Sequence, residues 1–201
     1  VMHLLYESWS SIPLSENHIK QLHTLLLRHS DKDERHRGTY KSLSNSVAAF
    51  DADGNNLGVI FETSTPFETP MQMEALIHWT NQALASSIMH PLVVIAIFIV
   101  RFLAIHPFQD GNGRLSRILT TLLLLRSGYA YVPYSSMESV IERNKEGYYL
   151  ALRRTQITLR QDVPQWDYWL VLFLKAMKKQ KDNLLQKVER ERYFLQALPQ
   201  L

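Results

Sequence analysis

The sequence predicts a compact all-α domain that carries one small β-hairpin. Apolar residues recur at three- and four-residue spacing along most of the 201 residues, as they do in amphipathic helices. Two short apolar runs flank a single Asp/Gly/Asn-rich turn at 51–56, which is typical of a hairpin. Hydrophobic residues make up 46% of the chain and charged residues 20%, close to globular averages, so a disordered or fibrous chain is excluded.

The first half of the chain is expected to hold two helices and the hairpin. Ser15 is a favourable N-cap for a helix that runs to about His29, and the polar stretch 30–38 predicts an exposed loop. The hairpin covers about residues 46–63. Thr69-Pro70 then opens a helix, with threonine as the cap and proline at the first helical position. The predicted buried stripe of that helix comprises Met73, Leu76, Ile77, Leu84 and Ile88.

The second half is expected to form the core. Residues 92–105 are apolar nearly all round, as in a central buried helix. A glycine-containing turn, 107–113, separates this helix from an amphipathic one that ends near Gly128. Ser135 and Glu138 have the spacing of a capping box, which predicts a further helix start.

Helical spacing resumes over residues 148–159, and Pro164 begins a last long helix. The side chains of this helix that are expected to pack inward are Trp166, Trp169, Leu170, Phe173, Leu174 and Met177. The sequence contains no internal repeat and no low-complexity linker, so it reads as one compact domain.

Composition excludes several classes of protein. The absence of cysteine rules out a disulfide scaffold, a thiolate zinc site and a thiol nucleophile, and it permits a reducing, cytoplasmic compartment. The longest apolar run, Leu92–Val100, has nine residues, far short of the roughly 20 that span a bilayer. The formal charge of +3 gives little support for nucleic-acid binding, so neither a membrane nor a nucleic acid is expected as a partner.

One segment of twelve residues, 106–117, reads HPFQDGNGRLSR and carries the candidate chemistry. Gly111 and Gly113 let the backbone approach a ligand, and the N–H groups that start the next helix form an anion site. Arg114 and Arg117 lie three residues apart and so share one helical face. Two guanidinium groups over a helix N-terminus favour a polyphosphate over a single carboxylate.

Two further side chains of this segment suit phosphate chemistry. Asp110 would be repelled by a phosphate unless a cation such as Mg²⁺ bridged them. His106, at the rim, is a candidate general base or acid. Each piece also has a plainer interpretation, as a helix end with a satisfied histidine, solvated arginines or a simple connection.

The predicted hairpin offers a docking edge. Phe61, Glu62 and Thr63 lie at the edge of the short β element, where an extended segment of another protein could add as a strand through main-chain hydrogen bonds. The same hairpin could equally serve only to cover the core.

The complete string His106–Arg117 resembles the signature of the Fic domain family, HPFx[D/E]GNGRxxR, at every specified position. Weaker likenesses follow in the family's order over roughly residues 14–160. They are Ile19–His23 ("I..LH..L"), Arg37–Lys41 ("GxYR", with lysine where arginine is common), the flap strand Gly58–Thr63, the helix Pro70–Trp79 and Asn144–Leu152 ("N...YY..L"). The resemblance implies a Fic-like catalytic domain over 1–160, flap included, and a C-terminal helix over 161–201.

The resemblance also implies an enzyme, a protein adenylyltransferase. Such an enzyme moves AMP from ATP to a Ser, Thr or Tyr hydroxyl of a target protein and releases pyrophosphate. Carried over by position, His106 would deprotonate the hydroxyl, Asp110 would hold Mg²⁺, Gly111, Asn112 and Gly113 would cradle the phosphates, and Arg114 and Arg117 would neutralise the leaving end. Asn144 and Tyr148 are candidates for the adenine pocket, and Phe108 is expected to face the core as an anchor.

Other functions stay open at this stage. Fic relatives transfer UMP or phosphocholine, or remove AMP from a modified target, and a non-catalytic nucleotide-binding regulator is a further alternative. A DNA-binding regulator is a third class, although residues 160–201 resemble one long helix more than a winged helix. The family's inhibitory motif, [S/T]xxxE[G/N], has no match in a suitable context, so an inhibitory helix is expected upstream of Val1 or on a partner chain. A homodimer is left open.

Overall fold

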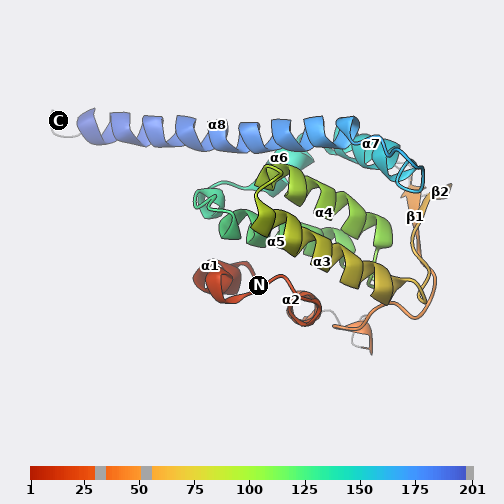
Figure 1. The fold of residues 1–201 in the computed structure, drawn as a ribbon. Coiled ribbons are helices and arrows are strands. Elements are labelled where there is room, and N and C mark those ends of the chain that lie inside the picture. Colours follow the sequence, from red (N-terminus) through yellow and green to blue (C-terminus); the bar gives the residue numbers. More distant parts are fainter. Residues whose placement is uncertain (30–34, 51–55, 198–201) are drawn as a thin grey trace.

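The computed structural model describes residues 1–29, 35–50 and 56–197, which form a helical bundle with a two-stranded sheet at one end (Figure 1). The predicted all-α fold class is confirmed. In chain order the elements are α1 (Met2–Ser8), η1 (Trp9–Ser11), α2 (Glu16–Leu26), β1 (Ser46–Phe50), β2 (Asn56–Glu62), α3 (Thr69–Ser86), α4 (Pro91–Ile105), α5 (Asn112–Arg126), η3 (Val132–Tyr134), α6 (Met137–Glu142), α7 (Lys145–Gln156) and α8 (Asp167–Ala197).

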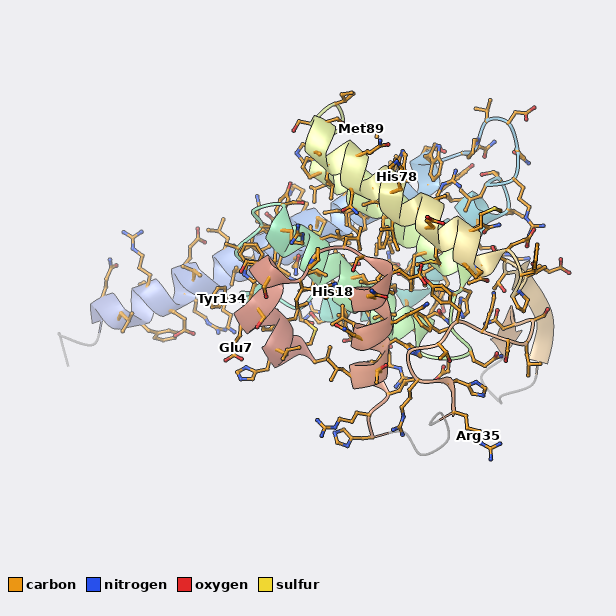
Figure 2. All side chains as sticks on the ribbon, turned by 60° about the horizontal axis from the view of Figure 1, so that its bottom comes forward. Glu7, His18, Arg35, His78, Met89 and Tyr134 are labelled. Carbon is orange, nitrogen blue, oxygen red and sulfur yellow. The ribbon has the colours of Figure 1, made fainter. Side chains whose placement is uncertain are left out.

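Helix α4 is the centre of the core, as its uniform apolarity predicts. It contacts α3, α5, α7 and α8, and its buried residues include Val94, Ile95, Phe98, Ile99 and Phe102. Helix α5 is buried along most of its length as well. Helices α1 and α2 lie below α5 in Figure 1 and come to the front in Figure 2, and α2 and η1 contact α5 directly. The segment that joins α4 to α5 therefore lies between two largely buried helices.

Strands β1 and β2 pair antiparallel at one end of the bundle. Ser46 pairs with Glu62 and Val47 with Phe61, after which the register shifts so that Ala48 pairs with Val59. Most of the predicted turn, 51–55, lies outside the described residues.

The structure corrects two predicted helix caps. Helix α3 is preceded by a capping box one turn upstream of Thr69: the Thr65 Oγ1 accepts from the Glu68 N–H, and the Glu68 carboxylate accepts from the Thr65 N–H at 2.9 Å. The N-cap of α6 is Ser136, whose hydroxyl accepts from the Ser139 N–H. Ser135 instead donates to the Gln180 carbonyl on α8. At α3 the N-cap position is Glu68 and Thr69 is the first helical residue; at α6 the adjacent serine takes the cap, which sequence spacing alone does not decide.

Two predicted core residues are exposed. Helix α3 ends at Ser86 because Ser87 adopts a left-handed conformation with φ 54°, so Ile88 leaves the helical stripe and is 87% exposed. Leu174 lies on the exposed side of α8. Of the remaining residues of the α3 stripe, Met73, Leu76 and Ile77 are buried as predicted, and Leu84 is partly buried against the core.

Helix α8 is anchored by its first turns. Trp169, Phe173 and Met177 are buried at helical spacing, and the Trp169 Nε1–H donates to the Ala96 carbonyl of α4 at 2.7 Å. The C-terminal part of α8 extends beyond the bundle (Figure 1). Among the helices that the structure describes, none combines the length and apolarity needed to cross a bilayer.

The anchor gives a stability test. Replacing Trp169 with alanine removes a buried indole and its hydrogen bond, so we expect the free energy of unfolding to fall by about 3–5 kcal/mol in urea titrations followed by circular dichroism. Tyr168, the preceding residue, is exposed, and Tyr168→Ala should cost less than about 1 kcal/mol. Equal losses in the two variants would show that α8 is not anchored at Trp169.

Candidate active site

The candidate site begins where α4 ends, at His106. This residue is the C-cap of α4 and has a left-handed backbone with φ 53°, and its N–H still donates to the Phe102 carbonyl at 2.9 Å. Pro107 explains the break, because a residue before proline is disfavoured in the right-handed helical region. The left-handed turn ends the helix and leaves the histidine at the mouth of the loop.

The rest of the loop is anchored from within. Phe108 is fully buried and stacks on the ring of His23, with ring centroids 3.8 Å apart. Asn112 is only 1% exposed: its Oδ1 accepts from the Phe108 N–H at 2.9 Å and its Nδ2 donates to the Phe108 carbonyl at 2.7 Å. The Phe108 anchor is as predicted. The Asn112 side chain, by contrast, faces the loop and not a ligand, so only the backbone of Asn112 is placed to contact a phosphate.

The two glycines of the loop serve different needs. Gly111 is the N-cap of α5 with φ 79°, a conformation that favours glycine, and a Cβ there would lie 3.3 Å from the Nε2 of His23, a tight contact. A Cβ on Gly113 would meet nothing within 4 Å. The first turn of α5, whose N–H groups have no acceptor within the helix, is therefore open to a ligand at Gly113.

Arg114 and Arg117 both face one cavity of about 980 Å³, as their spacing predicts. This cavity lies between α1, α5, the segment 132–138 and α8, and Lys187 of α8 also lines it. Each arginine holds an exposed carboxylate: Arg114 binds Asp110 at 2.8 Å and Arg117 binds Glu138 at 3.2 Å. Such surface ion pairs contribute at most about 1 kcal/mol, so a phosphate can displace them at small cost.

Asp110 presents the carboxylate that suits a cation. Its side chain is exposed next to the start of α5, while its main-chain carbonyl accepts from His23. No group of three or more metal-ligating side chains occurs within the part of the chain that the structure describes. A single carboxylate fits Mg²⁺, which commonly takes one or two carboxylates and completes its shell with phosphate oxygens and water.

His106 is neutral at pH 7. Burial lowers its pKa to about 4, and the positive charge of Lys41 acts in the same direction. Its Nδ1 lies 3.3 Å from the Leu103 carbonyl, which can only accept, so Nδ1 carries the proton. The lone pair is then on Nε2, as a general base requires.

Three residues that the sequence left unassigned hold the loop from outside. The Gly38 N–H donates to His23 Nδ1, so His23 Nε2–H donates to the Asp110 carbonyl at 3.0 Å. The Lys41 N–H donates to the Pro107 carbonyl, and Asn45 Nδ2 donates to the Phe108 carbonyl. His23 and Lys41 fall in the weakly matching family segments, and that was the only sequence signal for them.

The other predicted site residues lie outside the loop itself, although Thr63 is joined to it through Lys41 and Asn45. Tyr148 packs edge-on against Trp169 at 5.3 Å and shares a cavity of about 20 Å³ with Arg117, and burial raises its pKa. Asn144 is exposed at the start of α7 and lines neither of the cavities that include Arg117. Of the docking edge, Glu62 is exposed, Thr63 is buried, and the side chain of Phe61 lies outside the described residues.

Comparison with known proteins identifies the family. A model of the Fic/DOC family matches residues 13–124, more than half of the 201 residues, so the chain belongs to this family. The protein adenylyltransferase Fic of Drosophila virilis is 42% identical over 64 residues, which are 32% of this chain and 13% of that protein. The protein of the same name from Drosophila yakuba is 37% identical over 87 residues, 43% of this chain and 17% of that protein.

Solved structures agree with this assignment. A Fic domain containing signaling protein from Bacteroides thetaiotaomicron aligns with a TM-score of 0.66 and 26% identity over 92% of this chain and 66% of its own. A Fic family protein from Desulfovibrio desulfuricans aligns with a TM-score of 0.69 and 27% identity over 94% of this chain and 52% of its own. The chain thus corresponds to only part of its relatives.

The charge state of His106 can be measured directly. We expect its imidazole to titrate with a midpoint of about 4 by NMR, against an ordinary value of 6.5. Because the unfolded chain binds this proton more tightly, the stability that the histidine contributes is complete above pH 6.5 and falls as the pH drops towards 4. In His106→Asn, the free energy of unfolding should depend less on pH over this range. A midpoint near 6.5 would contradict the burial argument.

Proposed function

We propose that this chain transfers AMP from ATP to a Ser, Thr or Tyr hydroxyl of a target protein, with release of pyrophosphate. The observation that carries the proposal is one short loop with a neutral His106 at its start, an α5 N-terminus that is open at Gly113 at its end, and Arg114 and Arg117 facing one cavity. Family membership and curated relatives named protein adenylyltransferase support the same reaction.

The reaction balances with these groups. The target hydroxyl oxygen forms a bond to the α-phosphorus of ATP, the bond from that phosphorus to the bridging oxygen of pyrophosphate breaks, and the hydroxyl proton passes to Nε2 of His106. A free imidazole with a pKa of about 4 is a weak base. Binding of an anionic nucleotide nearby favours the imidazolium and raises that pKa, so the base strengthens when substrate is present.

The charged residues around the loop would hold the phosphates. Asp110 would bind Mg²⁺, which neutralises phosphate charge when present. Engagement of the Asp110 carboxylate would release Arg114 from its ion pair, and Arg117 would likewise exchange Glu138 for the departing pyrophosphate. Backbone N–H groups of Gly111, Asn112 and Gly113 would complete the cradle. The protein would contribute mainly positioning and charge stabilisation, as in other phosphoryl-type transfers.

The adenine base has a candidate position on the wall of the same cavity. Tyr134, which is labelled in Figure 2, has an exposed ring and lines the cavity, as does Met137. Tyr148 stays a candidate because it lines a second, smaller cavity together with Arg117. Asn144 has no such position, so it is the weakest of the predicted adenine contacts.

The target segment is proposed to dock on the two-stranded sheet. A free main-chain edge accepts an extended segment without demanding a particular sequence. The sheet is tied to the signature loop through Thr63 and Asn45, which places its base next to His106. An inhibitory helix from upstream of Val1 or from a partner chain, and a homodimer, are compatible with this arrangement.

The first test uses labelled ATP with Mg²⁺ and a cell lysate. We expect label from the α-phosphate, and none from the γ-phosphate, to appear on protein, and His106→Ala to lower the rate by about 10²–10⁴-fold while ATP binding persists. His78→Ala, at an exposed histidine of α3 (Figure 2), is the matched control. Equal rates in His106→Ala and the parent would overturn the role of the base.

The same assay separates the alternatives. Label from UTP in place of ATP indicates UMP transfer, and release of AMP from a modified target indicates the reverse reaction. Nucleotide binding without transfer from any donor indicates a regulatory module.

The docking edge has its own test. Phe61→Pro removes a main-chain N–H from the strand, so we expect target modification to fall roughly tenfold, which corresponds to about 1.4 kcal/mol, while ATP affinity changes little. Glu62→Ala keeps the N–H and changes only an exposed side chain, which makes it the control. Parallel losses of target modification and ATP affinity in Phe61→Pro would argue that the strand supports the fold and does not dock the target.

A further inference from the structure

Lys41 is a buried cation that makes no ion-pair contact among the described residues, although the charge of Glu68 acts on it at longer range. It is 4% exposed, and its ammonium donates to three neutral oxygens: Asn45 Oδ1 at 2.8 Å, Thr63 Oγ1 at 2.8 Å and the Ile105 carbonyl at 2.9 Å. An ammonium group has three N–H bonds, so this cage uses all of them. The cage therefore fits the protonated form of the side chain.

The position of this cage relative to His106 is specific. The main-chain N–H of Lys41 donates to the Pro107 carbonyl at 2.8 Å, while its side chain holds the Ile105 carbonyl. One residue thus binds the carbonyls on both sides of His106. The Ile105 carbonyl belongs to the C-terminal end of α4, where unpaired carbonyls and the helix dipole favour a cation.

The cage also joins the loop to the sheet. Thr63 directly follows β2, and its hydroxyl lies 2.7 Å from the Asn45 carbonyl. Asn45 directly precedes β1 and donates to the Phe108 carbonyl of the loop. Both strands of the sheet are therefore fastened, at their base, to the residues around His106.

The cation of Lys41 is buried at a cost. Burial of an ammonium group costs free energy, and burial lowers the pKa of Lys41 to about 8. A methionine of similar length would avoid that cost but would leave the Ile105 carbonyl and the Asn45 Oδ1 without this donor. The contact that offsets the cost is thus made to the carbonyl directly before His106, which points to a role at the site.

We propose that Lys41 is a positioning residue that fixes His106 at the end of α4 and fastens it to the base of the sheet on which the target docks. The inference rests on the proposed function, because positioning matters only if His106 acts as the base. Lys41 touches neither nucleotide nor target in this account, and it acts through the Ile105 and Pro107 carbonyls.

The test compares Lys41→Met with Lys41→Arg in the full chain. Displacement of a reacting group by about 1 Å costs about 10²-fold in rate, so we expect Lys41→Met to lower kcat by about that factor with the KM for ATP nearly unchanged. Arginine restores the charge and the donors, so Lys41→Arg should recover most of kcat. Lys20→Met, which removes a lysine over the neighbouring Tyr40 ring, is the control and should leave kcat unchanged.

Hydrogen exchange of the His106 N–H provides a readout without activity. This N–H donates to the Phe102 carbonyl in the last turn of α4, so we expect it to exchange faster in Lys41→Met and at the parent rate in Lys41→Arg. If the parent transfers nothing from any nucleotide, the proposed function fails, and the exchange rates still decide whether Lys41 holds the loop.

Two results would overturn the inference. One is a folded Lys41→Met with the kcat and His106 exchange of the parent, and the other is an unchanged kcat alongside faster exchange. Should Lys41→Met not fold, Thr63→Val removes one oxygen of the cage and keeps the lysine. We then expect a smaller loss of kcat with KM preserved, and an unchanged kcat would reject the proposal.

Discussion

The left-handed backbone at His106 is the constraint on which the rest of the site depends. A non-glycine residue in that conformation costs about 1–3 kcal/mol, so neighbouring contacts must hold it there. Pro107 prevents the helix from continuing, Asn112 closes the loop onto Phe108, and Lys41 binds the carbonyls on either side of the histidine. The left-handed turn places the histidine at the start of the loop that leads to the N-terminus of α5. Without these contacts the histidine would relax towards an ordinary helix end.

This arrangement is possible because α4 and α5 are both buried along most of their length. Two buried helices cannot shift to accommodate a loose loop, so a polar connection between them must satisfy its own backbone groups. His23 and Asn45 supply partners from outside, and the Asn112 side chain supplies them from within. The charged side chains that remain on the surface are held only by weak ion pairs. The loop therefore combines a backbone that is fixed by hydrogen bonds with charged side chains that a bound ligand can reposition.

The sequence predicts the parts of this molecule that depend on periodicity or on a contiguous motif. The buried α4 and the amphipathic α5 follow from apolar spacing, and the segment from His106 to Arg117 follows from a continuous string. The cap of α6 was misplaced by one residue because the adjacent Ser135 and Ser136 have equal propensity, and tertiary contacts decide between them. His23 and Lys41 could not be assigned, since their bonds to the loop span 87 and 64 positions and an isolated polar residue leaves no periodic signal.

The same long-range bonds explain why the sheet and the loop act as one unit. A sheet of two strands is marginal in water by itself, so it needs support from the bundle. Here that support comes through Asn45 and Thr63, whose polar groups surround a cation at the end of α4. Since hydrogen bonds to a charged group are roughly twice as strong as neutral ones, this junction is stiffer than neutral contacts alone would make it. A segment that docks on the sheet would then have a fixed position relative to His106, because the same junction holds the histidine in its strained conformation.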